Sequence, residues 1–337
     1  MKISFVEPHL KLYGGIRRIL ELSNRLLSLG EEVRIYHPDG TSCSWMTCKA
    51  ETKTLNHIFK DEHDVIIFNY PPDYKIVKKA KARLKVFYIL GLPEKEPLKK
   101  YSLNIFWANK GIASTLRRSL HLPFLKISNA TWIYKYLKKH LNINTELVIG
   151  GVNRDIFYPI TVKKKQDKFR ILCSGDPRNG KGTETVYEVF NILKKDFNNI
   201  ILDTYYGKNI PQTNMAEKYC SADLFVDAQT YGGWNNPVAE AMACKVPVVC
   251  TDIGGVQDFA IHENTALLVP PKRPDILASE ITRMIKDEDL RNRLKENAYQ
   301  HIIQFDWDKS AKRMRDILYN NMRINKRNRW YGGLLSL

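Results

Sequence analysis

The residues best suited to chemistry lie in a glycine-rich loop, 174–183, which is predicted to join a buried strand to a helix. Lys181 places a full positive charge in this loop, and Arg178 could hold an anion through two hydrogen bonds. Gly175 and Gly182 allow the backbone to approach a ligand, and the start of a helix offers unpaired N–H groups. This combination favours a phosphate-bearing leaving group, whose developing negative charge the cations would stabilise.

A second candidate is the stretch 231–252, which is predicted to form a polar loop, a helix and a strand. Asn236 is the expected N-cap of the helix and Pro237 its first residue, so Glu240 lies about one turn inside it. Ligands of open α/β sheets bind at such junctions. A carboxylate there can accept two hydrogen bonds from the vicinal hydroxyls of a ribose. The alternative role for Glu240 is compensation of the helix dipole.

This second stretch resembles the donor-sugar loop of glycosyltransferase family 4, the retaining enzymes of the GT-B fold within glycosyl transferases group 1. The residues that match the family pattern are Pro237, Val238, Glu240, Ala241, Met242 and Ala243. The resemblance implies that Glu240 holds the ribose of a nucleotide and that the preceding loop meets the donor sugar. The donor-binding residues implied for this loop are Gly233, Trp234, Asn235, Asn236, Pro237 and Val238.

The part of this loop that would contact the sugar departs from the family. The family's first glutamate, which contacts donor-sugar hydroxyls, is replaced by Gly232. Asn235 and Asn236 could supply amide contacts in its place. Trp234 could be a platform for the sugar or a part of the core, since a single tryptophan suits both.

The loop that contains Lys181 is similar to the family's phosphate-binding segment, Gly-Arg-x-x-x-x-Lys-Gly. Gly175, Lys181 and Gly182 match, but the position of the arginine is Asp176, so Arg178 is the candidate substitute. The resemblance therefore implies that Lys181 and Arg178 stabilise the diphosphate and that Gly175 and Gly182 bind the donor. A P-loop is the competing interpretation, although Gly182 stands where a P-loop needs Ser or Thr.

Near the N-terminus, Gly14 and Gly15 are similar to the family's Gly-Gly turn close to the donor phosphates. The resemblance implies that Gly15 approaches the donor through its backbone. Arg17 or Arg18 could face an anionic group, and one of the two is expected to be an ordinary solvated helix residue.

Many family members place a histidine near the donor sugar, but the comparable strand end here, 90–93, has none. His9 and His63 are not obvious replacements and are expected to be ordinary surface or turn residues. We therefore assign no catalytic base and expect transfer to depend on stabilisation of the leaving group.

The elements that must position these residues alternate between strand and helix. In the first half, the predicted strands and helices are 1–6, 16–29, 32–36, 64–69, 74–83, 84–90, 104–108, 111–120, 130–140 and 146–149. In the second half they are 169–174, 183–194, strands near 200 and 224, 237–244, 246–251 and 274–286. Such alternation predicts parallel, doubly wound α/β sheets.

The resemblance implies a GT-B fold with two Rossmann-like domains that face each other across a cleft. We expect an acceptor-side domain over 1–159 and a nucleotide-sugar domain over 160–307, joined by a charged linker near 163–168. A last helix begins near 308, and the resemblance implies that residues 308–337 cross back to the first domain and end in a basic tail.

Composition adds constraints on partners. The 337 residues include 53 Lys and Arg against 36 Asp and Glu, a net charge of +17 that favours anionic partners. No run of apolar residues reaches the ~20 that a membrane span needs. Basic segments at 75–85 and 135–139 suit an anionic lipid surface or a solvated face. We expect a cytoplasmic protein that also touches the inner membrane face, and no nucleic-acid partner.

The function implied by the resemblance is retaining transfer of a sugar from a nucleoside-diphosphate sugar to a hydroxyl of a saccharide or lipid-linked saccharide. No cofactor is expected beyond the nucleotide-sugar co-substrate. The six cysteines and eight histidines show no metal-ligand spacing, so metal independence is expected. The alternatives are a non-catalytic GT-B-like protein that binds lipid or polymer, and a P-loop NTPase.

Overall fold

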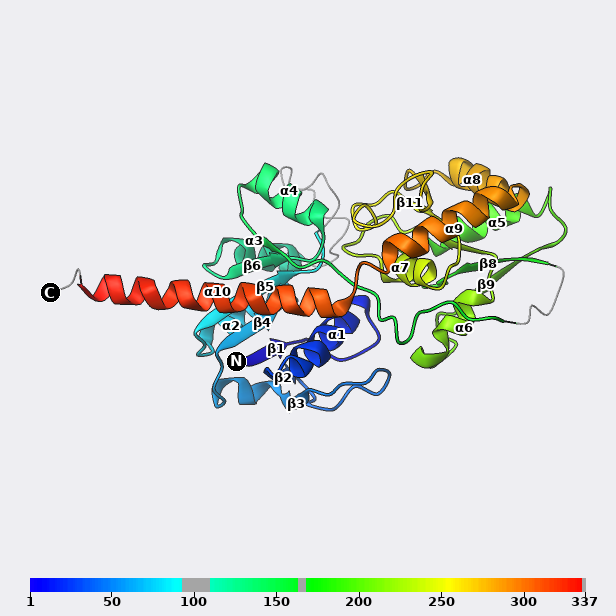
Figure 1. Ribbon diagram of the computed structural model, residues 1–337. Coiled ribbons are helices and arrows are strands. Elements are labelled where there is room, and N and C mark those ends of the chain that lie inside the picture. The colour runs from blue at the N-terminus through cyan, green and yellow to red at the C-terminus, as the bar shows by residue number, and fades with distance from the viewer. Residues whose placement is uncertain (93–109, 163–167, 335–337) are drawn as a thin grey trace. The chain divides into compact units, whose positions relative to one another are not determined.

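The computed structural model describes residues 1–92, 110–162 and 168–334. The chain forms two compact units (Figure 1). The first unit comprises Met1–Asn129, Ile133–Gly150 and Trp307–Leu337, and the second comprises Ala130–Trp132 and Gly151–Asp306. The strand predicted at 104–108 and most of the predicted linker lie outside the described residues.

The first unit contains a seven-stranded sheet in the order β3-β2-β1-β4-β5-β6-β7, with every pair parallel. The strands are β1 (Lys2–Val6), β2 (Glu32–His37), β3 (Glu51–Thr54), β4 (Val65–Phe68), β5 (Leu84–Ile89), β6 (Leu125–Ser128) and β7 (Glu146–Leu147). The central strand β4 reads Val-Ile-Ile-Phe and is buried throughout, as expected for a strand covered on both faces.

The helices of this unit are α1 (Gly14–Ser28), α2 (Tyr74–Lys79), α3 (Lys110–His121), α4 (Thr131–Leu141, except its first two residues) and α10 (Trp307–Leu334), with 3-10 turns η1 (Leu55–Phe59) and η2 (Pro71–Asp73). Helix α10 packs against α1, and its buried residues Trp307, Met314 and Ile317 join the core of the first unit. The last turns of α10 extend beyond the other elements of the unit (Figure 1).

The second unit contains a five-stranded parallel sheet in the order β12-β11-β10-β8-β9. Its strands are β8 (Phe169–Cys173), β9 (Ile200–Thr204), β10 (Leu224–Asp227), β11 (Val248–Thr251) and β12 (Leu267–Val269). Its helices are α5 (Thr183–Leu193), α6 (Met215–Cys220), α7 (Asn236–Ala243), α8 (Pro274–Lys286) and α9 (Glu288–Ile302), with a 3-10 turn η3 (Gln212–Asn214).

The order of the second sheet brings the two candidate loops together. Strand β8 pairs with β10, so the loops that follow these strands leave the same edge of the sheet side by side. The loop after β8 contains Lys181 and leads into α5, and the loop after β10 leads into α7, which contains Glu240. In open α/β sheets, ligands bind outside this carboxyl edge.

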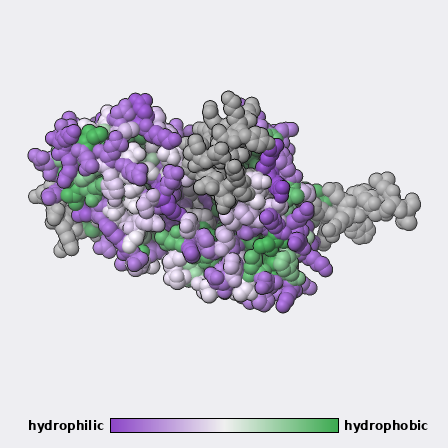
Figure 2. Space-filling model, turned by 180° about the vertical axis from the view of Figure 1, so that it is seen from behind, coloured by the Kyte–Doolittle hydropathy of each residue, from purple (hydrophilic) through white to green (hydrophobic). Residues whose placement is uncertain are grey.

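The prediction of two parallel, Rossmann-like α/β domains is confirmed, but several short elements were not predicted. Strand β3 reads Glu-Thr-Lys-Thr and forms the edge of its sheet, so no apolar run marks it. Strands β6 and β12 and helices α6 and α9 were also missed. In the view of Figure 2, hydrophobic side chains gather in separate patches among hydrophilic ones. In the described part of the chain no helix is long and apolar enough to cross a bilayer.

Candidate functional site

The first loop reaches α5 through glycines in left-handed conformations. Gly182 is the N-cap of α5 with φ +70°, and a Cβ there would lie 2.0 Å from the carbonyl oxygen of Ala228. Gly175 has φ +74°, and its Cβ would meet Thr204 at 2.7 Å. Only glycine fits both the conformation and the space. These glycines therefore allow the loops after β8, β9 and β10 to approach one another.

Lys181 lies at the centre of this junction. Its Nζ donates a hydrogen bond to the side-chain oxygen of Gln229 at 3.0 Å, which links the two loops. In the described part of the chain no carboxylate forms an ion pair with this ammonium. Burial lowers the pKa of Lys181, while the charge of nearby Asp227 opposes that shift. A partly buried cation whose direct partner is an uncharged amide is well suited to an added anion.

Arg178 has a different environment. Its guanidinium donates from both Nε and NH2 to the carboxylate of Asp176, with Nε 3.0 Å from each oxygen. The nearby cation lowers the pKa of Asp176 below its usual value, against the effect of burial. Asp176, which stands at the family's arginine position, therefore binds Arg178, the candidate substitute for that arginine. Arg178 would have to leave this ion pair, or share it, to contact a phosphate.

Hydrogen bonds from backbone and side chains hold the second loop against the first. The N–H of Thr230 donates to the carbonyl of Gly180 at 2.9 Å, and the hydroxyl of Tyr231 donates to the carbonyl of Asn179 at 3.0 Å. The loop backbone after β10 is therefore fixed next to the Lys181 segment. The structure brings together the two sequence motifs proposed to hold one ligand.

A buried carboxylate holds the second loop in place through hydrogen bonds. Asp227, the last residue of β10, accepts hydrogen bonds from the Gln229 N–H and the Asn235 Nδ2, both at 3.1 Å. Burial raises its pKa, and these hydrogen bonds and the charge of Lys181 oppose the rise. Sequence reasoning missed Asp227 and Gln229. The available signal was an aspartate that ends an apolar strand directly before a candidate loop.

The N-cap of α7 is Asn235, so the prediction of Asn236 was wrong. The Asn235 side chain accepts a hydrogen bond from the N–H of Val238, and its burial beside Asp227 favours it over Asn236, which is only partly buried. Helix α7 consequently begins at Asn236, with Pro237 as its second residue. This shift removes Asn235 as a free amide for ligand contact, because its side chain is used within the loop.

Glu240 is buried in α7 and 5% exposed. The hydroxyl of Tyr219, which ends α6 with Cys220, donates to its carboxylate at 2.9 Å. Tyr219 is itself fully buried and lies 3.3 Å from the hydroxyl of Tyr205. Dipole compensation alone would not require burial, so this environment favours a carboxylate held in a fixed orientation. Tyr219 was not identified from the sequence.

Trp234 belongs to the core. It is 8% exposed, and its ring packs against Phe259 and Phe305 with centroid distances of 4.5 and 5.6 Å. Of the two roles left open for it, the structure favours packing over a sugar platform. A Cβ on Gly232 would lie 2.4 Å from the amide nitrogen at the end of the Gln229 side chain, so that side chain would have to shift. Gly233 packs through its backbone, because its carbonyl oxygen lies close to Gly255.

In the first unit, α1 begins at Gly14, and a Cβ on Gly15 would lie 3.2 Å from Leu90. Arg18 does not face an open anion site. It is 2% exposed, donates to the hydroxyl of Tyr88 at 3.0 Å and stacks over Trp307, so its role is structural. The reason is that Arg18 lies on the face of α1 that packs on the sheet and on α10.

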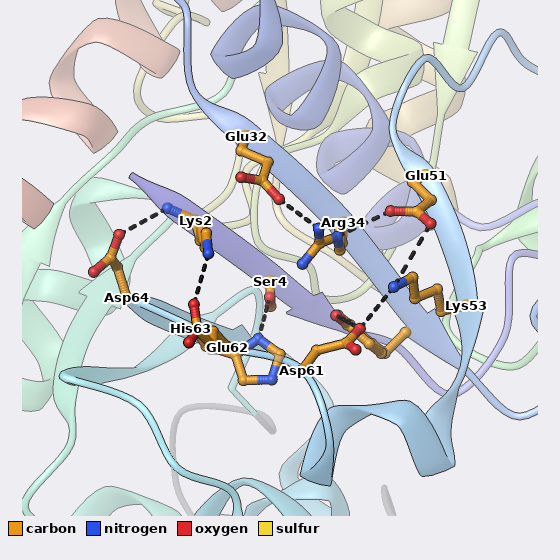
Figure 3. A network of polar contacts seen from close by, with 11 residues as sticks. Lys2, Ser4, Glu32, Arg34, Glu51, Lys53, Asp61, Glu62, His63 and Asp64 are labelled. Atoms are coloured by element: carbon orange, nitrogen blue, oxygen red, sulfur yellow. Dashed lines mark hydrogen bonds and ion pairs between the residues drawn. The ribbon is translucent and has the colours of Figure 1, made fainter.

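His63 has a structural role at the opposite end of this sheet (Figure 3). Its ring is 6% exposed, with Nδ1 2.7 Å from the Ser4 hydroxyl and Nε2 3.0 Å from the carbonyl of Ile58. Of the two roles expected for it, a surface or a turn residue, the surface role is wrong: His63 is a buried histidine in the loop before β4. It precedes β4, so it lies away from the carboxyl edge of the sheet.

The P-loop interpretation is not supported by the geometry of the first loop. Thr183, the hydroxyl residue nearest the P-loop position, donates through Oγ1 to the carbonyl of Asp176 at 2.6 Å. It is 8% exposed and is part of the internal bonding of the loop. The hydroxyl that a P-loop would offer to magnesium is thus already used.

Part of the chain is similar in sequence to known glycosyltransferases. Residues 203–301 match the family model described as Glycosyl transferases group 1. A putative teichuronic acid biosynthesis glycosyltransferase of Bacillus subtilis is 36% identical over 105 residues, which cover 31% of this chain and 26% of that protein. An uncharacterized glycosyltransferase of Methanocaldococcus jannaschii is 32% identical over 210 residues, which cover 55% and 57% of the two chains. The chain therefore spans about a quarter to about half of the length of these relatives.

Solved structures are similar over nearly the whole chain. The sucrose-phosphate synthase of Thermosynechococcus elongatus gives a TM-score of 0.74 with 18% identity, covering 96% of this chain and 99% of that one. The HepE protein of Anabaena, solved in complex with UDP-glucose, gives 0.71 with 15% identity, covering 95% and 100%. At these identities the likeness shows the fold: two Rossmann-like units of the GT-B type.

Proposed function

We propose that this protein is a retaining glycosyltransferase of family 4 that transfers a sugar from a nucleoside-diphosphate sugar to a hydroxyl of a saccharide or lipid-linked saccharide. The observation that carries the proposal is the environment of Lys181. This partly buried ammonium has an amide as its direct partner and lies beside the loop that leads to Glu240. The match of residues 203–301 to Glycosyl transferases group 1 supports the same class of reaction.

The proposed chemistry follows from the charges. The bond between the anomeric carbon and the diphosphate oxygen breaks, and negative charge develops on that oxygen. Lys181, held against the sheet edge, would stabilise this charge more strongly than a fully exposed lysine could, because a partly buried charge is screened less by water. The acceptor hydroxyl forms the new bond to the anomeric carbon, and its proton passes to the departing phosphate. This route needs no protein base.

In the proposed donor complex, Glu240 accepts the ribose hydroxyls, and the backbone of Gly233 and its neighbours meets the sugar. The hydrogen bond from Tyr219 fixes the carboxylate before the nucleotide binds, which reduces the ordering cost of binding. Gly175 and Gly182 are proposed to line the phosphates through their backbones. Arg178 is proposed to assist after exchanging part of its ion pair with Asp176 for the diphosphate.

We also propose peripheral contact with an anionic membrane through the first unit. A hollow of about 330 Å³ lies beside the amino end of β5, lined by Lys78, Ala82, Arg83, Leu84, Lys85, Leu122, Pro123 and Phe124. Basic and apolar side chains side by side suit a lipid headgroup region. Helix α4 adds Lys135, Lys138 and Lys139 together with Tyr134, which is 40% exposed.

The test is binding and turnover with a panel of UDP-, GDP- and dTDP-sugars. We expect at least one nucleotide sugar to raise the thermal unfolding temperature and to be hydrolysed or transferred. Lys181→Ala should lower turnover by roughly 100-fold or more, as removal of one charge-stabilising group does elsewhere. Lys208→Ala, which removes an exposed lysine of the same unit paired with Asp203, is the matched control. Equal turnover of the two variants would contradict the role of Lys181.

A further inference from the structure

Two cysteines of the second unit lie close together at the ends of neighbouring helices. Cys220 is the last residue of α6, and Cys244 is the C-cap of α7. Both are free thiols. Cys220 Sγ lies 3.5 Å from the carbonyl oxygen of Cys244, and a hydrogen bond joins the two thiols. The two residues are 24 positions apart in the sequence, so the packing of α6 against α7 brings the thiols together.

The surroundings of the two thiols differ. Cys244 is 3% exposed, whereas Cys220 is only partly buried, so a small solute can reach Cys220 first. The hydrogen bond with Cys244 lowers the pKa of Cys220 to about 7, against the effect of burial and with help from the N–H of Ile160, which donates to its sulfur at 3.4 Å. The hydrogen bond with Cys220 and burial raise the pKa of Cys244. Cys220 is therefore the nucleophilic member of the pair, because the thiolate is the reactive form of a cysteine.

We infer that Cys220 and Cys244 form a redox-reactive pair, which hydrogen peroxide oxidises to a disulfide. The Cys220 thiolate attacks one peroxide oxygen and the O–O bond breaks, which leaves a sulfenic acid on Cys220 and releases hydroxide. The Cys244 sulfur then attacks the Cys220 sulfur, the S–O bond breaks, and the departing hydroxide takes the proton of the Cys244 thiol. The two sulfurs lose two electrons and the peroxide gains them. With the proton that Cys220 released at the start, the products are one disulfide and two water molecules.

The disulfide would act on the donor site through the helices that it joins. Tyr219 directly precedes Cys220 in α6, and its hydroxyl donates to Glu240 of α7 at 2.9 Å. Glu240 lies one turn before Cys244, whose N–H donates to the Glu240 carbonyl at 3.0 Å. A covalent bond is shorter than a contact between two thiols, so its formation draws the end of α6 toward α7 and shifts Tyr219 against Glu240. We therefore expect oxidation to weaken nucleotide binding, an effect that rests on the proposed role of Glu240, whereas the disulfide does not.

The test for the disulfide is peptide mapping by mass spectrometry without reductant, on the full chain treated with hydrogen peroxide. The wild type should give a peptide that joins Cys220 to Cys244 and separates on addition of dithiothreitol. Cys244→Ser should stop at the sulfenic acid, which dimedone labels on Cys220, and Cys220→Ser should give neither product. The control is Cys48→Ser, which removes a partly buried thiol of the first unit and should form the joined peptide as the wild type does. Absence of that peptide from the oxidised wild type would overturn the inference.

Calorimetric binding of UDP, GDP and dTDP to the same samples separates this inference from the proposed function. Oxidation should weaken nucleotide binding by the wild type by roughly fivefold or more, and dithiothreitol should restore it. Binding by Cys220→Ser should not respond to peroxide. A joined peptide with unchanged nucleotide affinity would overturn the effect on the donor site. Absence of nucleotide binding by the reduced wild type would overturn the proposed donor chemistry and, with it, that effect, but would leave the disulfide standing.

Discussion

Lys181 and Arg178 lie in the same loop, but the structure gives them different capacities. Arg178 is held by both oxygens of Asp176, whereas Lys181 donates to the uncharged amide of Gln229. An ion pair must be weakened before Arg178 can meet an anion, and no such step applies to Lys181. The proposed catalytic charge is therefore assigned first to Lys181, with Arg178 in an assisting role.

A prediction at the scale of the residue concerns Asp73. Its pKa is raised from 3.8 to about 7, so the folded state binds a proton that the unfolded state has released between these values. The free energy of unfolding must then fall as pH rises from about 4 to 7, by up to about 4 kcal/mol from this group. Asp73→Asn should remove that loss. Urea unfolding at pH 5 and pH 8 should show a smaller pH difference for the variant than for the wild type.

Glu62→Gln serves as the control for this measurement, because Glu62 is exposed and its pKa is lowered by Lys2. The Glu62→Gln variant should keep the wild-type difference in unfolding free energy between pH 5 and pH 8, apart from the small contribution of Glu62 itself. An Asp73→Asn variant that loses stability equally at both pH values would show that the carboxylate has a partner that the structure does not reveal.

At the scale of the element, the donor site depends on two strand-to-helix junctions that touch. The loops before α5 and α7 are joined by the Lys181–Gln229 and Tyr231–Asn179 hydrogen bonds and by the close approach of Gly182 to Ala228. The loops are therefore one structural unit, and a change in their packing should affect stability and nucleotide binding together.

Gly182→Ala tests this dependence. The new Cβ would lie 2.0 Å from the Ala228 carbonyl oxygen and would also require φ +70°. We expect a loss of roughly 2–4 kcal/mol in stability and a clear loss of nucleotide affinity. Gly207→Ala is a matched control, because Gly207 has φ +73° with nothing within 4 Å of the added Cβ. It should cost only the backbone strain, about 1 kcal/mol, and leave nucleotide affinity unchanged.

Equal effects of Gly182→Ala and Gly207→Ala on calorimetric nucleotide affinity would contradict a site built from the contact of the two loops. Equal effects on stability alone would show that the Ala228 segment moves aside at little cost.

Prediction from sequence succeeded best for helices and strands, because their signals lie in residues that are neighbours along the chain. Buried parallel strands are short apolar runs and the helices between them have a regular apolar period, so β1, β4, β10 and α8 could be located. Strand β3, four polar residues at a sheet edge, has neither signal. The cap of α7 was misplaced by one residue because both asparagines suit the position. The burial of Asn235 beside Asp227 decided between them.

At the scale of the whole molecule, the net charge of +17 and the basic hollow beside β5 predict binding to anionic membranes. The protein should sediment with vesicles that contain phosphatidylglycerol, less so in high salt, and not with phosphatidylcholine alone. Replacing Lys75, Lys79 and Lys81 together by Ser should weaken vesicle binding by roughly tenfold or more, at ~1 kcal/mol for each charge. All three are exposed on the first unit.

The control replaces the exposed lysines 194, 195 and 208 of the second unit, which removes the same charge from a different surface. If both triple variants lose vesicle binding equally, the attraction depends on total charge and not on the first unit. Absence of vesicle binding by the wild type would contradict the membrane proposal without affecting the donor site.

The sequence by itself determined the strand–loop–helix pattern, the glycines at the turns and the presence of Lys181 and Glu240 at two such junctions, because these depend on neighbours along the chain. The tertiary structure decided which side chains are available for chemistry. Lys181 contacts Gln229, which is 48 residues away in the sequence, and Glu240 contacts Tyr219, which is 21 residues away. Trp234 packs in the core. Burial, partners and pKa depend on contacts between distant segments, so only the folded chain could show that Lys181 lacks a carboxylate partner in the described structure while Arg178 has one.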